Sequence, residues 1–129
     1  MLPRYPGYSV RVPNSEPLVL TEERHDAVVV VRCAGELDIA TVGTLRARLK
    51  EVQVDGASQL VLVLDDVTFL DSLGLGALIG AHKRARVLRG SLVIVCTSPQ
   101  VLNVFAATSM HRVFRVVDSL EEALEAQPV

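Results

Sequence analysis

The sequence is poor in aromatic residues and contains no tryptophan. Aromatic residues make up 4% of its 129 residues, whereas 50% of the residues are hydrophobic. The core must therefore be built from valine, leucine, isoleucine and alanine, a composition that suits buried parallel strands covered by helices. A chain of this length fits one domain and is long enough to bury a sizeable core.

An excess of basic charge is also missing, since the formal net charge is -2 at pH 7. Domains that bind nucleic acid usually carry a basic excess, so we expect no direct nucleic-acid partner. No apolar run approaches the roughly 18 residues that a bilayer-spanning helix needs. Pro3, Pro6 and Pro13 interrupt the N-terminus, which lacks a signal-peptide pattern. We therefore expect a soluble, cytoplasmic protein with no membrane partner.

Cysteine and histidine are scarce and scattered. Cys33 and Cys96 both lie in apolar runs, which is typical of small buried side chains in a reducing compartment. His25, His82 and His111 are far apart, and no H-x-x-x-H or C-x-x-C spacing occurs. The sequence therefore predicts no metal site and no cofactor, and His82 is interpreted as a half-buried packing residue of a helix.

Strand and helix patterns alternate after a proline-rich start. We predict an extended or loose arm over 1–17 and a single domain over 18–129. Strands are expected at 18–24, 28–38, 59–67, 91–96 and 111–118, and helices at 39–52, 72–88, 97–109 and 119–127. This order predicts the α/β class, with a mixed, mainly parallel sheet of about five strands, an antiparallel first edge strand and four helices.

The segment FLDSLGLGALIG, Phe69–Gly80, places three glycines inside a predicted helix. A glycine in a helix interior costs about 1 kcal/mol relative to alanine. Gly74, Gly76 and Gly80 would let the helix pack close to the sheet, or would leave a flat surface for a partner. The sequence leaves both explanations open.

Two enzyme patterns fit this segment poorly. A serine hydrolase needs G-x-S-x-G, but Leu70 stands where the first glycine before Ser72 is required. A dinucleotide fold needs an acidic residue after the next strand, and the strand at 91–96 is followed by Thr97 and Ser98. We therefore predict that the protein is not an enzyme.

Ser72 itself lies where a buried strand passes into a helix. Parallel sheets place functional groups beyond the carboxyl ends of their strands, and Asp38 and Asp65 or Asp66 fall at the same edge. A phosphate on Ser72 would add about −1.5 to −2 charges and would repel a partner packed there. A serine before a helix is also a common cap, so a switch and a cap both remain open.

Two motifs resemble the STAS domain, named for sulfate transporters and anti-sigma factor antagonists. They are GELDIATVGTL at Gly35–Leu45 and LVLVLDDVTFLDSLGLGAL at Leu60–Leu78. The resemblance covers about Leu18–Glu125 and is strongest to stand-alone bacterial anti-sigma factor antagonists. It implies a STAS-like fold and partner switching, in which the unphosphorylated antagonist binds an anti-sigma factor. That anti-sigma factor is commonly a serine kinase, and a phosphatase resets the switch.

The resemblance also implies which residues act. The serine after aspartate in FLDS, Ser72, corresponds to the phosphoacceptor. The implied partner-binding and switch surface consists of Glu36, Asp38, Asp71, Leu73, Gly74, Leu75 and Gly76. Leu73 departs from the family pattern, because many antagonists carry serine or threonine there. The alternative function is a STAS scaffold, or a regulatory module that binds a nucleotide or another ligand without being phosphorylated. The chain could be a monomer or a weak dimer.

Overall fold

The structure, a computed structural model, describes residues 18–56 and 59–126. The arm predicted over 1–17 and the chain end at 127–129 lie outside the described residues. The strands are β1 (Val19–His25), β2 (Val28–Leu37), β3 (Gln59–Leu70), β4 (Ser91–Val95) and β5 (Arg115–Val117). The helices are α1 (Val42–Val54), α2 (Ser72–Val87), α3 (Pro99–Ala107), α4 (Leu120–Glu125) and a short 3-10 turn at Met110–Arg112.

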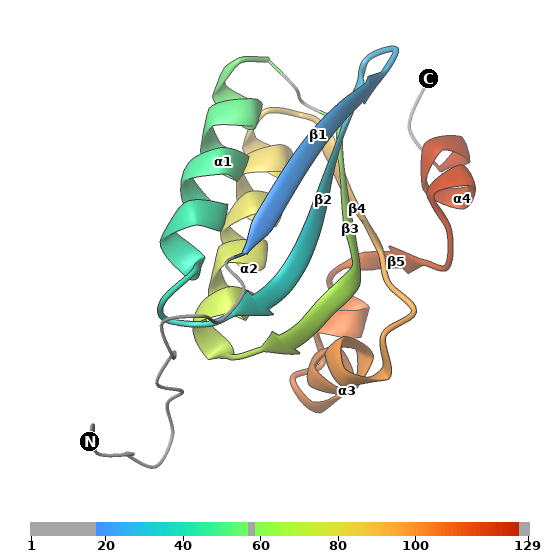
Figure 1. The fold of residues 1–129 in the computed structure, drawn as a ribbon. Coiled ribbons are helices and arrows are strands. Elements are labelled where there is room, and N and C mark those ends of the chain that lie inside the picture. The colour runs from blue at the N-terminus through green and yellow to red at the C-terminus, as the bar shows by residue number, and fades with distance from the viewer. Residues whose placement is uncertain (1–17, 57–58, 127–129) are drawn as a thin grey trace, which may run out of the picture.

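The five strands form one sheet in the order β1-β2-β3-β4-β5 (Figure 1). β1 pairs antiparallel with β2, and the remaining neighbours pair in parallel. The predicted α/β class, mixed sheet and antiparallel edge are confirmed. Because parallel strands need long crossovers, the helices lie against the faces of the sheet and bury the aliphatic strands between them.

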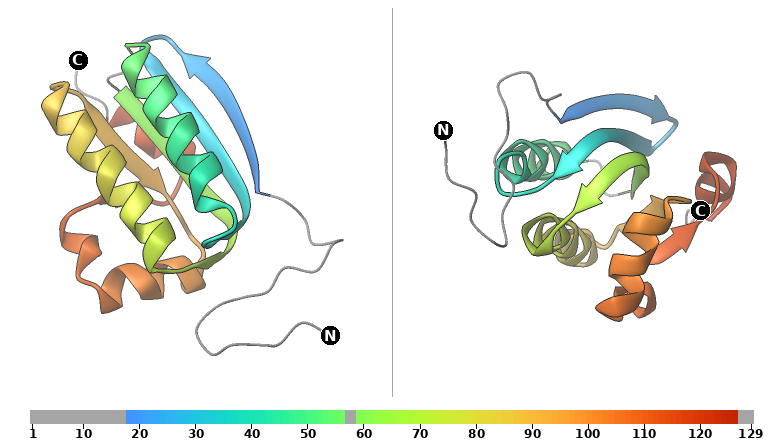
Figure 2. Two further views of the ribbon diagram at one scale, coloured as in Figure 1. Left: turned by 90° about the vertical axis from the view of Figure 1, so that its left-hand side faces the viewer. Right: turned by 60° about the horizontal axis from the view of Figure 1, so that its bottom comes forward.

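The two faces of the sheet are covered unequally. α1 and α2 lie side by side over one face (Figure 2), where the larger core includes Leu45, Leu62 and Leu78. α4 covers part of the opposite face, where Val61 and Val93 belong to the smaller core. Successive residues of a strand point to opposite faces, so the uninterrupted valines and leucines of the central strands supply both cores.

Several element boundaries differ from the sequence prediction. α1 begins at Val42 rather than Ile39, because a turn occupies the preceding residues. β3 continues beyond Val67 to Leu70, because its end still pairs with the end of β2. β5 is limited to three residues, because the predicted start of the strand forms the 3-10 turn instead.

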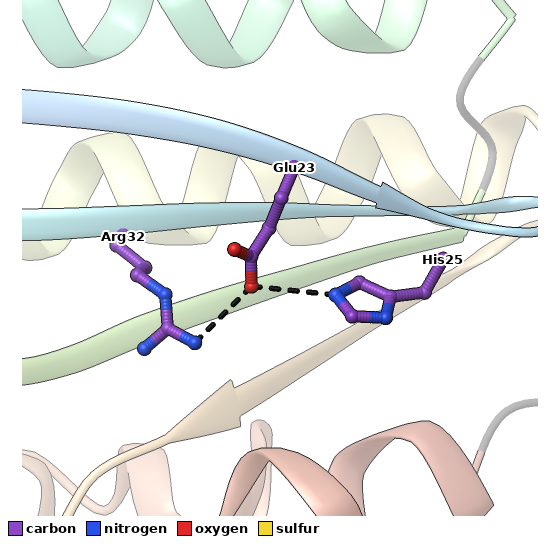
Figure 3. A network of polar contacts seen from close by, with 3 residues as sticks. All are labelled: Glu23, His25 and Arg32. Atoms are coloured by element: carbon purple, nitrogen blue, oxygen red, sulfur yellow. Dashed lines mark hydrogen bonds and ion pairs between the residues drawn. The ribbon is translucent and has the colours of Figure 1, made fainter.

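The edge strand β1 and its neighbour β2 share a small charged network (Figure 3). Glu23 Oε1 accepts a hydrogen bond from Arg32 Nη2 at 3.1 Å and lies 3.3 Å from His25 Nε2. These hydrogen bonds, from His25 first and then from Arg32, hold the pKa of the Glu23 carboxyl below its usual value. Exposed charges on an edge strand discourage pairing with the strand of another molecule.

The isolated cysteines and His82 have packing roles. Cys33 and Cys96 are both free and buried, as predicted, and burial raises the pKa of the Cys33 thiol to about 12. Cys33 lies in β2 and Cys96 directly follows β4, and β3 lies between these two strands in the sheet. His82 is half-buried, as predicted, and its ring meets Phe114 edge-on at a centroid distance of 5.9 Å.

Gly74 allows the first turn of α2 to approach β2 closely. A Cβ atom added there would lie 2.9 Å from Leu37 Cβ, 3.0 Å from Leu37 O and 2.7 Å from Leu70 Cδ1. The first two of these atoms cannot move away without a shift of the β2 backbone. Helix–sheet packing therefore accounts for this glycine.

We expect Gly74→Ala to lower the free energy of unfolding by about 1–3 kcal/mol, because the added methyl group overpacks this contact. Chemical denaturation of the purified variant measures the change. The matched control is Gly43→Ala in α1, where an added Cβ meets no atom within 4 Å. This control should retain or gain stability, by up to about 1 kcal/mol. Wild-type stability of Gly74→Ala would contradict the packing explanation.

Candidate functional site

The two sequence motifs meet at one edge of the sheet. Parallel pairing of β2 with β3 places Glu36 opposite Phe69 and Leu37 opposite Leu70. The backbone N–H of Asp71 then donates to the carbonyl oxygen of Leu37 at 3.1 Å. We call the residues of these two junctions, 36–41 and 69–76, the Ser72 edge; it lies where α1 and α2 begin in Figure 1.

Asp71, rather than Ser72, caps α2. Asp71 has an extended backbone with φ −102°, and its Oδ1 accepts hydrogen bonds from Leu73 N and Gly74 N, each at 3.0 Å. These bonds satisfy two of the amide groups that a helix leaves unpaired at its start. Ser72 is the first helical residue, and its side chain is exposed. The interpretation of Ser72 as the helix cap is therefore wrong.

Asp38 holds the turn between β2 and α1. Its side chain is buried, with 2% exposure, and its Oδ1 accepts a hydrogen bond from Ala40 N at 2.9 Å. The Thr41 hydroxyl donates to Glu36 O at 2.6 Å and accepts from Asp38 N at 3.1 Å. Asp38 and Thr41 thus fix the shape of the turn, and α1 has no side-chain cap bond at Thr41.

Asp65 and Asp66 lie within β3, which continues to Leu70, and they do not gather around Ser72. The Asp65 carboxylate accepts bonds from Thr97 N at 2.7 Å and from Thr97 Oγ1 at 3.0 Å. It therefore ties the end of β4 to β3. Asp66 pairs in register with Ala34, four residues before β3 ends at Leu70.

Large apolar side chains are exposed around Ser72. Ile39 is 61% exposed, Phe69 is 43% exposed and Leu73 is 39% exposed. Exposed apolar side chains that share one edge are typical of protein–protein contact sites. The helix predicted over 39–52 included Ile39, but Ile39 lies in the turn held by Asp38, before α1 begins at Val42.

The implied switch residues differ in exposure. Leu73 is exposed, whereas Glu36, Asp71 and Gly76 are half-buried. Asp38, Gly74 and Leu75 are buried. The last three residues can shape the Ser72 edge but have little surface to offer a partner. Sequence reasoning did not include Ile39 and Phe69 in the contact surface, although each is an apolar residue inside one of the two motifs.

Neither a metal-binding cluster nor a membrane-spanning helix is found in residues 18–56 and 59–126. In these ranges no group of three histidine, cysteine, aspartate or glutamate side chains is arranged to hold a metal ion. Nor is any helix there long and apolar enough to cross a membrane.

Comparison with known proteins identifies the family of this chain. The model of the STAS domain matches residues 20–123, and the chain belongs to this family. It is 29% identical to the anti-sigma F factor antagonist of Paenibacillus polymyxa over 108 residues, covering 83% of this chain and 92% of that protein.

Solved structures agree with this assignment. An anti-sigma factor antagonist from Mycobacterium paratuberculosis superposes with a TM-score of 0.80 at 29% identity, covering 92% of this chain and 98% of that one. The phosphorylated form of the Bacillus cell fate determinant SpoIIAA superposes with a TM-score of 0.66 at 25% identity, covering 83% and 97% of the two chains. The predicted STAS-like fold and the resemblance to antagonists are confirmed.

We expect Asp71→Ala to destabilise the protein by about 1 kcal/mol, because it removes both cap bonds of α2. Ser72→Ala is the matched control at the neighbouring position and should change the free energy of unfolding by less than about 0.5 kcal/mol. Denaturant titration of both variants measures the difference. Equal destabilisation by the two changes would show that the serine contributes to the cap.

Proposed function

We propose that the protein is an anti-sigma factor antagonist controlled by phosphorylation of Ser72. In this proposal the unphosphorylated chain binds an anti-sigma factor, and the phosphorylated chain releases it. The observation that carries the proposal is the exposed Ser72 side chain, which lies at an edge with exposed apolar residues. Asp71, and not Ser72, makes the hydrogen bonds that cap α2. The names of the antagonists that the chain resembles support the same role.

The local charges explain how a phosphate would act. A phosphate on Ser72 would lie at the start of α2, where the helix dipole favours negative charge. The neighbouring Asp71 carboxylate opposes it, so the net effect on the fold is small. A partner that covers the Ser72 edge would have to bury a dianion, which is costly without compensating cations. The phosphate therefore weakens binding more than it weakens folding.

The contact residues of this proposal are the exposed ones. Leu73, Ile39 and Phe69 supply apolar area, and the half-buried Glu36 and Gly76 lie beside them. Asp38, Asp71, Gly74 and Leu75 position this surface. The proposal includes two further partners, a serine kinase, which is commonly the anti-sigma factor itself, and a phosphatase. It places the protein in the cytoplasm, and in it this chain neither catalyses a reaction nor contacts nucleic acid directly. It concerns the domain predicted over 18–129.

We expect a kinase-type anti-sigma factor with ATP and Mg²⁺ to phosphorylate the wild-type chain at Ser72, as located by mass spectrometry. Ser72→Asp should bind that partner about tenfold more weakly or worse, whereas Ser72→Ala should bind like the unphosphorylated wild type. Ser98→Asp is the charge-matched control, because it places a carboxylate at the start of α3. If all four proteins bind with equal affinity, the Ser72 switch is wrong and the scaffold function stands instead.

The apolar contact is tested separately. Ile39→Ser and Leu73→Ser should each weaken binding of the anti-sigma factor by about tenfold, because central apolar contacts often contribute more than 1 kcal/mol to an interface. Val87→Ser is the control, because Val87 is 82% exposed at the far end of α2. Calorimetric titration gives the affinities. A loss of affinity in Val87→Ser alone would place the partner elsewhere.

A further inference from the structure

A pocket lies on the exposed side of the helix pair α1 and α2. Its volume is about 440 Å³, and its lining consists of Gly43, Arg46, Ala47, Lys50 and Arg84. Small-molecule sites in proteins are commonly concave and of about 300–1,000 Å³. The pocket is shallow and open to solvent, but its volume falls in this range, and Ser72 is not among its lining residues.

The lining is strongly basic. Arg46, Lys50 and Arg84 are its charged members, and no salt bridge to any of them is found among the described residues. Arg46 and Lys50 are four residues apart on α1, a spacing at which like charges repel. α1 and α2 together contain six basic residues and one acidic residue, Glu51, whereas the whole chain has a net charge of -2. The positive charge is therefore concentrated on this helix pair.

Buried contacts hold one of the cations in place. Arg84 Nε donates to Gln53 Oε1 at 2.8 Å, and Gln53 Nε2 donates to Ala81 O at 2.9 Å. Gln53 is 2% exposed, so its amide group is a fixed support for the guanidinium group. Arg84 itself is half-buried, whereas Lys83 and Arg86 beside it are exposed.

The two remaining glycines of α2 leave room for the arginine side chains. A Cβ atom at Gly76 would lie 3.4 Å from Arg46 Nη2, and one at Gly80 would lie 3.5 Å from Arg84 Nη1. Side chains larger than a methyl group at these positions would displace the guanidinium groups. Gly74 therefore allows α2 to pack against the sheet. Gly76 and Gly80 leave space on the surface of α2 for the guanidinium groups of Arg46 and Arg84.

We propose that this pocket binds a small ligand that bears a phosphoryl group. Arginine forks match the oxygen atoms of a phosphoryl group, and lysine adds a third positive charge. A dianion would relieve the repulsion between Arg46 and Lys50. An acidic segment of a protein is a less suitable occupant, because the lining is confined to five residues around one hollow. This site goes beyond the proposed antagonist function and does not depend on it.

Titration of the ¹⁵N-labelled full chain with pyrophosphate, followed by amide NMR shifts, tests the proposal. We expect saturable shifts centred on Arg46, Lys50 and Arg84. Arg46→Gln and Lys50→Gln should each raise the dissociation constant by about tenfold. Arg86→Gln is the charge-matched control, because Arg86 is exposed on α2 outside the pocket lining and its loss should change the constant less than twofold.

Parallel titrations with inorganic phosphate and ATP distinguish a simple phosphate ligand from a nucleotide, and tighter binding of either supports the site. Absence of saturation with all three probes up to about 10 mM would overturn the proposal. An equal loss of affinity in Arg86→Gln would overturn it as well, because only diffuse charge attraction would then be present. Binding of a glutamate-rich peptide without binding of these probes would replace it with a protein-contact site.

Discussion

The contact between the end of β2 and the first turn of α2 determines how the rest of the candidate site is arranged. The Asp71 amide bonds to Leu37 O, and Gly74 packs directly against the same residue. Parallel pairing of β2 and β3 brings these residues into register. The segments 36–41 and 69–76, which α1 and most of β3 separate in the sequence, therefore form one edge of the molecule.

This arrangement separates structural roles from surface roles. Asp71 caps α2, the buried Asp38 shapes the turn before α1, and Gly74 and Leu75 belong to the packed interior. Ser72 and Leu73 remain exposed on the first turn of the helix. Because no described cap bond depends on the serine hydroxyl, modification of that hydroxyl changes the surface while the supporting contacts stay in place. The basic pocket lies on the same helix pair, and its lining residues are not members of the Ser72 edge.

Much of the fold could be predicted from local patterns. Runs of valine and leucine indicated the buried strands, and spacings of three and four indicated the helices, because these periods reflect which faces are covered. Patterns of this kind do not report long-range pairing. The extension of β3 to Leu70 depends on β2, and the exposure of Ile39 depends on hydrogen bonds made by Asp38. The side-chain support of Arg84 by Gln53 spans 31 residues and had no local signal.

The central claim is that a phosphate on Ser72 prevents a partner from binding at the Ser72 edge while the domain stays folded. The most direct measurement compares the affinity of the anti-sigma factor for the unphosphorylated chain and for the chain phosphorylated stoichiometrically at Ser72. The account predicts that phosphorylation weakens binding by about a hundredfold or more, because a buried dianion costs several kcal/mol, while the thermal unfolding midpoint stays nearly constant. Equal affinity of the two forms, or loss of binding only through unfolding, would contradict it.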